Sequence, residues 1–315
     1  MRNTLFALSR RQFLILVAAS PLCAVDREVT RPEISEQVSP IDVIAPIARD
    51  GYRGQGLSRK PPGAGPFPAV LLIHGGMVTR SLAMLRDMEH NFATPSRFLA
   101  AGYVTVVLTY RGRDLDPQSK DAIEDCLAAV DHLRRLAYVD PKSIVVYGCS
   151  NGGDLALEVA SATEVCAIVS EEPASIMLTG VFNSSTPKKG ERYEPADSFP
   201  ILADPKRYYG PENQRTTRAK ITRIRCAILI VQGDQHPVNK FNAEVLIPEL
   251  LTAGKKLEVR TYPGEPHCFC FSGSGPQTPR PAVALTAFRT IETFCRSYVA
   301  TKPVPIHPSL IREVL

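Results

Sequence analysis

Residues 143–160 read SIVVYGCSNGGDLALEVA, and the rest of the chain is interpreted outward from them. After Ser143 the stretch is apolar and rich in β-branched side chains as far as Tyr147, which predicts a buried strand. The residues from Gly153 onward predict a helix. Ser150 lies between Gly148 and Gly152 on the bend between them, the G-x-S-x-G pattern of a nucleophile elbow. Such a sharp turn leaves no room for side chains at the flanking positions. The stretch therefore predicts Ser150 as a nucleophile held above a sheet.

Strands alternate with helices over about 250 residues around this stretch, which predicts a mostly parallel sheet with helices on both faces. An antiparallel edge hairpin is expected from 41–47 and 54–57, and residues 77–90 read as irregular. Further strands are expected at 68–73, 103–108, 143–147, 165–169, 227–231 and 257–262, and helices at 96–101, 119–136, 239–253 and 281–299.

Residues 171–225 carry charges, prolines and tyrosines without clear periodicity. So long a structureless loop is unusual in a compact domain, so this stretch is interpreted as an insertion, or lid, after the strand that follows the nucleophile helix. The predicted organisation is a signal peptide at 1–24, a linker at 25–40, a catalytic domain at 41–300 and a tail at 301–315.

The N-terminus carries a predicted export signal. Ser9-Arg10-Arg11-Gln12-Phe13-Leu14 precedes a short apolar run and resembles the twin-arginine signal of bacteria. The run is too short to span a bilayer. We expect cleavage near Ala24 and a periplasmic or secreted mature protein, without stable membrane insertion.

The composition is that of a globular protein, with 44% hydrophobic and 22% charged residues among 315. A net charge of +5 is modest and does not indicate a nucleic-acid partner. Loss of Cys23 with the leader would leave seven of the eight cysteines, so they could not all pair. Cys268-Phe-Cys270 has the wrong spacing for a zinc knuckle. The sequence leaves the oligomeric state open.

Three residues at predicted strand ends form a candidate catalytic triad. Ser150 would be the nucleophile, Asp234 the acid and His267 the base, in the chain order expected for this kind of fold. Glu171 and Glu172 end the strand after the nucleophile helix and are rival acids.

Backbone N–H groups are expected to form an oxyanion hole. The N–H of Asn151 follows the nucleophile, and Gly75 and Gly76 follow an early strand, where their small size lets the backbone approach a substrate carbonyl. His74 is expected to support this loop rather than to act in catalysis. No cofactor and no metal are predicted, because the grouping of Asp234, His236 and His267 lacks a further close ligand.

These motifs together resemble the α/β-hydrolase superfamily, and more narrowly its dienelactone-hydrolase and prolyl-oligopeptidase-like branch. The resemblance covers roughly residues 41–300, with two departures. Dienelactone hydrolases use cysteine at the elbow where this chain has Ser150, and prolyl oligopeptidases carry a β-propeller for which this chain has no room. The motifs are FPAVLLIHGG at 67–76, VDP at 139–141, GCSNGG at 148–153, GD at 233–234 and YPGEPH at 262–267.

The resemblance and the triad together imply a serine hydrolase that cleaves a small carboxylic ester through an acyl-enzyme. One alternative is an exopeptidase with the same machinery acting on amides. A second is an inactive hydrolase fold kept as a binding module, since fold alone does not prove activity. A third is thiolate attack by Cys149, which we expect to face into the fold.

Overall fold

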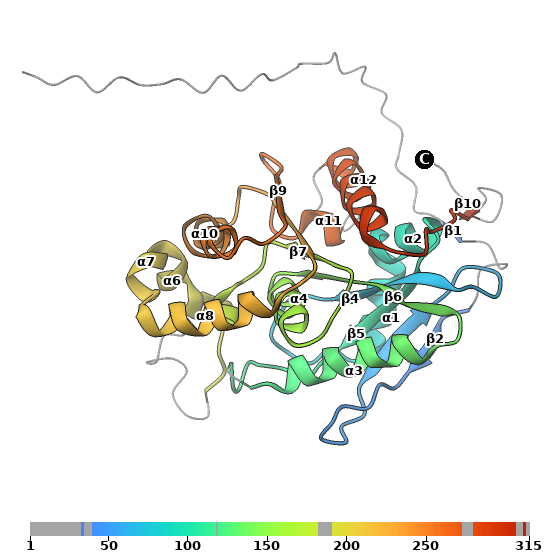
Figure 1. Cartoon of the computed structure of the whole chain (residues 1–315), viewed down its shortest axis with the longest axis horizontal. Helices are drawn as coiled ribbons and strands as arrows, with labels where there is room; N and C mark the ends of the chain where they lie inside the picture. The colour runs from blue at the N-terminus through green and yellow to red at the C-terminus, as the bar shows by residue number, and fades with distance from the viewer. Residues whose placement is uncertain are drawn as a thin grey trace, which may run out of the picture.

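The computed structural model describes residues 33–34, 40–117, 119–181, 191–272, 280–306 and 311–312. The predicted signal peptide at 1–24 lies outside these ranges. One eight-stranded sheet has the order β2-β3-β5-β4-β6-β7-β8-β9 (Figure 1). Its strands are β2 Asp42–Ile44, β3 Gln55–Arg59, β4 Phe67–Ile73, β5 Val104–Thr109, β6 Val139–Cys149, β7 Ala167–Glu171, β8 Ala227–Gln232 and β9 Leu257–Thr261.

The strand pairing confirms the predicted sheet. β2 and β3 form an antiparallel hairpin at one edge, and β3 is also antiparallel to β5. All other pairs, from β5 through β4 and β6 to β9, are parallel. Parallel neighbours end at the same edge of the sheet, so the loops after β4, β6, β7, β8 and β9 gather on one side, where a site can form. A separate antiparallel pair joins β1 Glu33–Ile34 to β10 Ile311–Arg312.

Helices follow most of the strands. Residues 77–90, predicted as irregular, instead contain most of α1, whose N-cap Ser81 accepts a hydrogen bond from the N–H of Met84. The apolar signal of α1 is short, because only Leu82, Leu85 and Met88 of its residues pack into the core. The helices are α1 Leu82–Asn91, α2 Ala93–Ala100, α3 Asp121–Arg135, α4 Asn151–Ala162, α5 Ile176–Thr179, η1 Pro195–Ser198, α6 Phe199–Ala203, α7 Pro205–Tyr208, α8 Pro211–Arg223, α9 Val238–Phe241, η2 Asn242–Leu246, α10 Ile247–Thr252, α11 Phe269–Ser272 and α12 Pro281–Tyr298.

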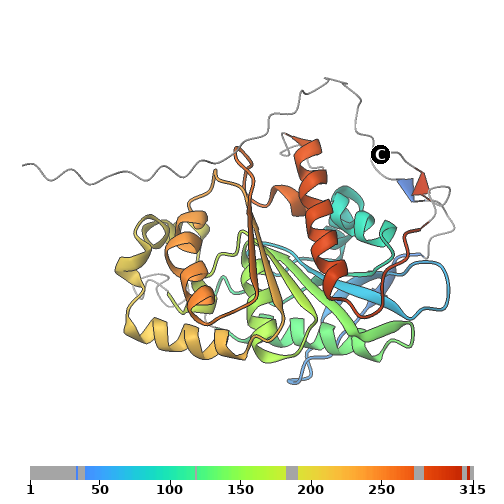
Figure 2. The same ribbon diagram turned by 45° about the horizontal axis from the view of Figure 1, so that its top comes forward.

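Both faces of the sheet are covered, and alternate residues of each strand enter opposite cores. In β4, Leu71 and Ile73 pack with α3, α4 and α10, whereas Val70 and Leu72 pack with α1, α2, α11 and α12. Figure 2 shows α12 on one side of the sheet and α3 on the other. Each such fully buried side chain stabilises the fold by about 2 kcal/mol. Among the described residues, no helix has the length and apolar character needed to cross a membrane.

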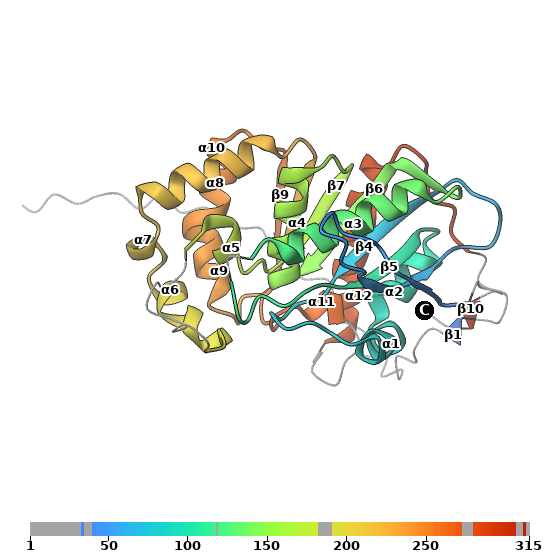
Figure 3. The ribbon, with the colours of Figure 1, turned by 90° about the horizontal axis from the view of Figure 1, so that it is seen from below.

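The predicted insertion at 171–225 contains α5, η1, α6, α7 and α8. The periodicity of the sequence did not predict these helices. Figure 3 shows α6, α7 and α8 together at one end of the molecule, beyond α4. A third, smaller hydrophobic cluster joins this region to α9 and η2 and includes Met177, Tyr193, Ile201, Phe241 and Val245. Met77, just after the predicted oxyanion glycines, packs against this cluster, so the insertion borders the carboxyl ends of the strands.

Candidate active site

The bend from β6 into α4 lies at Ser150 and has the tight geometry that the sequence predicts for a nucleophile elbow. Ser150 has φ 54° and ψ −120°, a conformation that few residues other than glycine adopt. A Cβ atom on Gly148 would lie 1.9 Å from the carbonyl oxygen of Gly152, and one on Gly152 would lie 2.2 Å from that of Ile73. Both positions therefore require glycine. Two hydrogen bonds hold the backbone of Ser150. Its N–H donates to Glu171 O, and its carbonyl oxygen accepts from the N–H of Asp154.

The loop after β4 lies against the elbow. A Cβ atom on Gly75 would stand 3.2 Å from the Cβ of Ser150, so the glycine allows the loop backbone to come close to Ser150. Gly76 has φ +86°, in the left-handed region that favours glycine. Gly75 and Asn151, the first residue of α4, thus lie next to Ser150, and Gly76 follows in the same loop.

Two side chains clamp this loop. Asn151 Nδ2 donates to Gly76 O and to the hydroxyl of Tyr110, each at 3.0 Å. The Tyr110 hydroxyl donates to Gly76 O at 2.6 Å and also lies 3.0 Å from His74 O. Tyr110 follows β5 and is fully buried, and burial raises its pKa so that it keeps its proton. Neither role was foreseen from the sequence, because both depend on the meeting of β4, β5 and α4.

His74 supports the same loop, as expected. Its Nδ1 donates to Gly75 O at 2.8 Å, and its ring stacks on Tyr110 with centroids 4.5 Å apart. Burial lowers the pKa of His74 to about 4, so the imidazole is neutral near pH 7. A neutral, stacked and enclosed ring is suited to holding the loop.

The loops after β7 and β9 bring a carboxylate to His267. Glu172 Oε2 lies 3.0 Å from His267 Nδ1, and the same oxygen accepts the backbone N–H of Cys268. Glu172 Oε1 accepts from the N–H of Gly233 and from Asn239 Nδ2, each at 3.2 Å. At this distance the ring N–H of His267 is not aligned for a hydrogen bond to Oε2. Glu172 is fully buried, so its oxygens depend on these partners in place of water.

In the structure, Glu172 and not the predicted acid Asp234 forms the ion pair with His267. Asp234 is exposed, and its Oδ1 accepts from the N–H of Gly264 at 2.8 Å and from Gln235 Nε2. These two hydrogen bonds lower the pKa of Asp234. Its side chain therefore stabilises the turn after β9, and Glu172, one of the two rival acids, occupies the place beside His267.

Glu171, the other rival acid, hydrogen-bonds to the sheet and to α11. Its carboxylate accepts from the Tyr147 hydroxyl at 2.5 Å and from the N–H groups of Cys270 and Phe271 at 2.8 Å. Burial raises the pKa of Glu171 to about 8. These contacts anchor the start of α11 to the sheet, while the backbone carbonyl of the same residue accepts from the N–H of Ser150.

The segment that carries His267 also touches the elbow. The thiol of Cys268 hydrogen-bonds with that of Cys149, the residue before the nucleophile. Both cysteines are unpaired, and the side chain of Cys149 is buried, as expected. His236 stacks on His267 with centroids 4.0 Å apart. Burial and the neighbouring His267 lower the pKa of His236 to about 4, so it packs against His267 as a neutral ring.

Buried charges tie the nucleophile helix α4 to the insertion. Asp154 accepts from the N–H of Met177 at 3.0 Å, and burial raises its pKa above the usual range of an aspartate. One turn further along α4, Glu158 pairs with Arg113 at 2.7 Å and with Lys220 at 2.8 Å. The insertion is thus held directly to the helix that begins just after Ser150.

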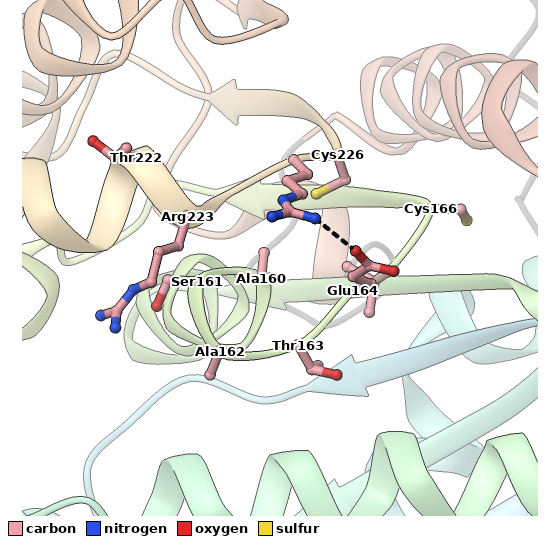
Figure 4. Close-up of a pocket in the computed structure, with 11 residues that line it drawn as sticks. Ala160, Ser161, Ala162, Thr163, Glu164, Cys166, Thr222, Arg223 and Cys226 are labelled. Carbon is pink, nitrogen blue, oxygen red and sulfur yellow. Dashed lines mark hydrogen bonds and ion pairs between the residues drawn. The ribbon is translucent and has the colours of Figure 1, made fainter.

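A surface pocket of about 640 Å³ lies at the other end of the sheet (Figure 4). It is formed by the end of α4, by the residues before β7 and β8, including Cys166 and Cys226, and by the end of α8. An ion pair between Arg225 and Glu164, 3.2 Å long, crosses it. This pocket lies at the amino ends of the strands, opposite Ser150, so it is not part of the candidate site.

Comparisons with known proteins agree with this architecture. The BD-FAE family model matches residues 58–179, which run from β3 to α5. Esterase EstD of Thermotoga maritima is 25% identical over 252 residues, which cover 70% of this chain and 58% of that protein. The chain therefore spans a little over half the length of this relative.

Solved structures show the same fold. A thermostable esterase from Pseudomonas putida ECU1011 superposes with a TM-score of 0.60 and 16% identity, over 85% of each chain. A puromycin-hydrolyzing peptidase of Mycobacterium tuberculosis superposes with a TM-score of 0.61 and 19% identity, over 85% of this chain and 41% of that one. The narrower resemblance to the dienelactone-hydrolase branch stays a prediction. The parallel sheet, the elbow and these likenesses together show that the chain is a member of the α/β-hydrolase superfamily.

Proposed function

We propose that this protein is a serine hydrolase that cleaves small carboxylic esters, with Ser150 as nucleophile, His267 as base and Glu172 as acid. The proposal depends mainly on one observation: the buried Glu172 carboxylate lies 3.0 Å from His267 Nδ1. The segment that carries His267 also contacts the bend before Ser150, through Cys268 and Cys149. The similarity to Esterase EstD supports ester chemistry.

The proposed reaction uses each group in turn. His267 takes the proton of Ser150 at Nε2 while the serine oxygen attacks the ester carbonyl. Glu172 holds the imidazole tautomer and stabilises the imidazolium. The N–H groups of Asn151 and of the Gly75–Gly76 loop receive the oxyanion, and each donor lowers the barrier by about 3 kcal/mol. His267 then protonates the leaving alcohol, and water hydrolyses the acyl-enzyme.

The decisive experiment is covalent labelling of the nucleophile. An organophosphonate should add one adduct, mapped to Ser150 by peptide mass spectrometry, and Ser150→Ala should lose labelling and roughly 10⁶-fold in kcat on p-nitrophenyl esters. Ser161→Ala, at the far end of α4, is the matched control and should be labelled normally. An adduct on Cys149, or full activity in Ser150→Ala, would overturn the mechanism.

The second candidate is an exopeptidase with the same triad, favoured by the likeness to the puromycin-hydrolyzing peptidase. Graded p-nitrophenyl esters should be assayed beside aminoacyl-p-nitroanilides. Amide turnover equal to ester turnover would reject the esterase assignment in favour of the peptidase. A purified, folded chain that labels with neither class of probe would instead support the inactive binding module.

Export is proposed from Ser9 to Leu14, which lie outside the described residues. Replacement of Arg10 and Arg11 together by lysine should retain the protein in the cytoplasm of a bacterial host, since the motif is defined by its paired arginines. Fractionation followed by immunoblotting measures this. Unchanged periplasmic or secreted protein in the variant would exclude twin-arginine export.

A further inference from the structure

Three potential metal-ligand atoms of different elements lie close together at the proposed base, His267. Glu172 offers a carboxylate oxygen, His267 offers Nδ1 and Cys268 offers Sγ, and all three lie within 4.8 Å of one another. They come from the loops after β7 and β9, and no described contact outside this cluster engages the ring Nδ1. A set of one oxygen, one nitrogen and one sulfur suits Zn²⁺ or Cd²⁺, whereas Mg²⁺ and Ca²⁺ prefer oxygen alone.

We propose that Glu172, His267 and Cys268 form a binding site for one thiophilic divalent cation, such as Zn²⁺ or Cd²⁺, which inhibits the enzyme by occupying the Nδ1 atom of its base. The binding part of this inference stands on the three ligands alone. The inhibition part rests on the function proposed above. The reaction itself needs no metal, so the cation would act as an inhibitor and not as a cofactor.

The spacing of the ligands is close to what a tetrahedral ion requires. Zinc bonds of about 2.0–2.3 Å place neighbouring ligand atoms about 3.2–3.6 Å apart. The oxygen and nitrogen are already 3.0 Å apart. Cys268 has φ 58°, and its thiol hydrogen-bonds with that of Cys149 inside the fold. A shift of this one side chain by about 1 Å would bring Sγ into coordination range.

Metal binding and catalysis exclude each other at His267. A cation bound at Nδ1 leaves the ring proton on Nε2, and that nitrogen can then no longer accept the proton of Ser150. The cation also binds the carboxylate that would stabilise the imidazolium. Coordination releases the thiol proton of Cys268 to solvent, and the imidazole stays neutral by moving its proton from Nδ1 to Nε2, so charge and atoms balance.

Cadmium is the probe of choice, because a Cd²⁺–thiolate bond absorbs in the near ultraviolet. The purified full chain should bind one equivalent of Cd²⁺ with this absorption band, and so should Ser150→Ala, because the serine is no ligand. Cys268→Ser should lose the band and weaken binding by at least about tenfold. Cys270→Ser is the matched control: its thiol lies two residues away, in contact with Ala284 O, and it should bind Cd²⁺ like wild type.

A second measurement avoids reliance on a folded Cys268→Ser variant. Stoichiometric Cd²⁺ should protect Cys268 of the wild-type chain from iodoacetamide, as mapped by peptide mass spectrometry, and Zn²⁺ should raise the thermal midpoint of Ser150→Ala. A wild-type chain that shows no saturable binding, or a folded Cys268→Ser that keeps the band, would overturn the site.

The two proposals fail in different ways. A chain that hydrolyses no ester yet binds Cd²⁺ through Cys268 would remove the proposed function and leave the metal site. An active esterase that binds no Cd²⁺ would do the reverse. An active esterase that binds Cd²⁺ through Cys268 without losing activity would overturn the inhibition.

Discussion

Glu172 and Asp234 follow neighbouring parallel strands, β7 and β8, yet their surroundings differ completely. Glu172 is fully buried, and three hydrogen-bond donors besides His267 surround its oxygens. Asp234 is exposed and hydrogen-bonds to the N–H of Gly264 in a turn and to the adjacent Gln235. Only the first carboxylate lies beside the histidine.

The contrast teaches what makes a carboxylate useful as a triad acid. A buried carboxylate without partners would be costly, so a site that buries one must surround it with donors. Those donors fix the position of Glu172, and the low dielectric around it strengthens its interaction with an imidazolium. Water around Asp234 would screen any such interaction.

The largest effect on this comparison is expected from Glu172→Gln. The amide cannot stabilise the imidazolium and can favour the wrong tautomer of His267, so kcat on a p-nitrophenyl ester should fall by up to roughly 10⁴-fold. Steady-state kinetics measure the loss, and circular dichroism checks that the variant is folded. A loss of less than about tenfold would mean that Glu172 only packs the loop.

A smaller effect is expected from Tyr110→Phe. Loss of the hydroxyl removes a donor to Gly76 O and a partner of Asn151, so the oxyanion loop should be held less firmly. One buried hydrogen bond contributes about 1 kcal/mol, so kcat should fall about fivefold with little change in KM. A rise in KM at unchanged kcat would contradict a role in the transition state.

Tyr103→Phe is the matched control for this prediction. Tyr103 is also fully buried, but its hydroxyl has no hydrogen-bond partner among the described residues. Its removal should leave kcat, KM and the thermal midpoint close to those of the parent. Equal losses in both variants would assign the effect of Tyr110→Phe to core packing.

The smallest effect is expected from Asp234→Asn, which tests the other side of the comparison. Surface substitutions usually change stability by less than about 0.5 kcal/mol, so kcat should stay within about threefold of wild type. The same ester assay measures it. A loss as large as that of Glu172→Gln would restore Asp234 as the acid and remove Glu172 from the triad.

Much of the fold was predictable because its signals are local. Continuous apolar runs such as Pro68–Ile73 mark strands buried on both faces, and the glycines beside Ser150 mark a turn that tolerates no side chain. α1 was missed because its apolar pattern is short and consists of Leu82, Leu85 and Met88 alone. The helices of the insertion are short and bury their apolar residues in a cluster shared with α9 and η2, so no single segment shows a clear pattern.

The sequence by itself determined the parallel sheet, the elbow at Ser150 and the position of His267 after the last strand of the main sheet, because each follows from short-range patterning. Only the tertiary structure decided which carboxylate accompanies that histidine. Glu172 and Asp234 both end strands at the same edge of the sheet, and the choice depends on how the loops after β7, β8 and β9 fold over one another. The clamp of Tyr110 and Asn151 and the meeting of Cys149 with Cys268 have the same origin: they join residues that are close in space and distant along the chain.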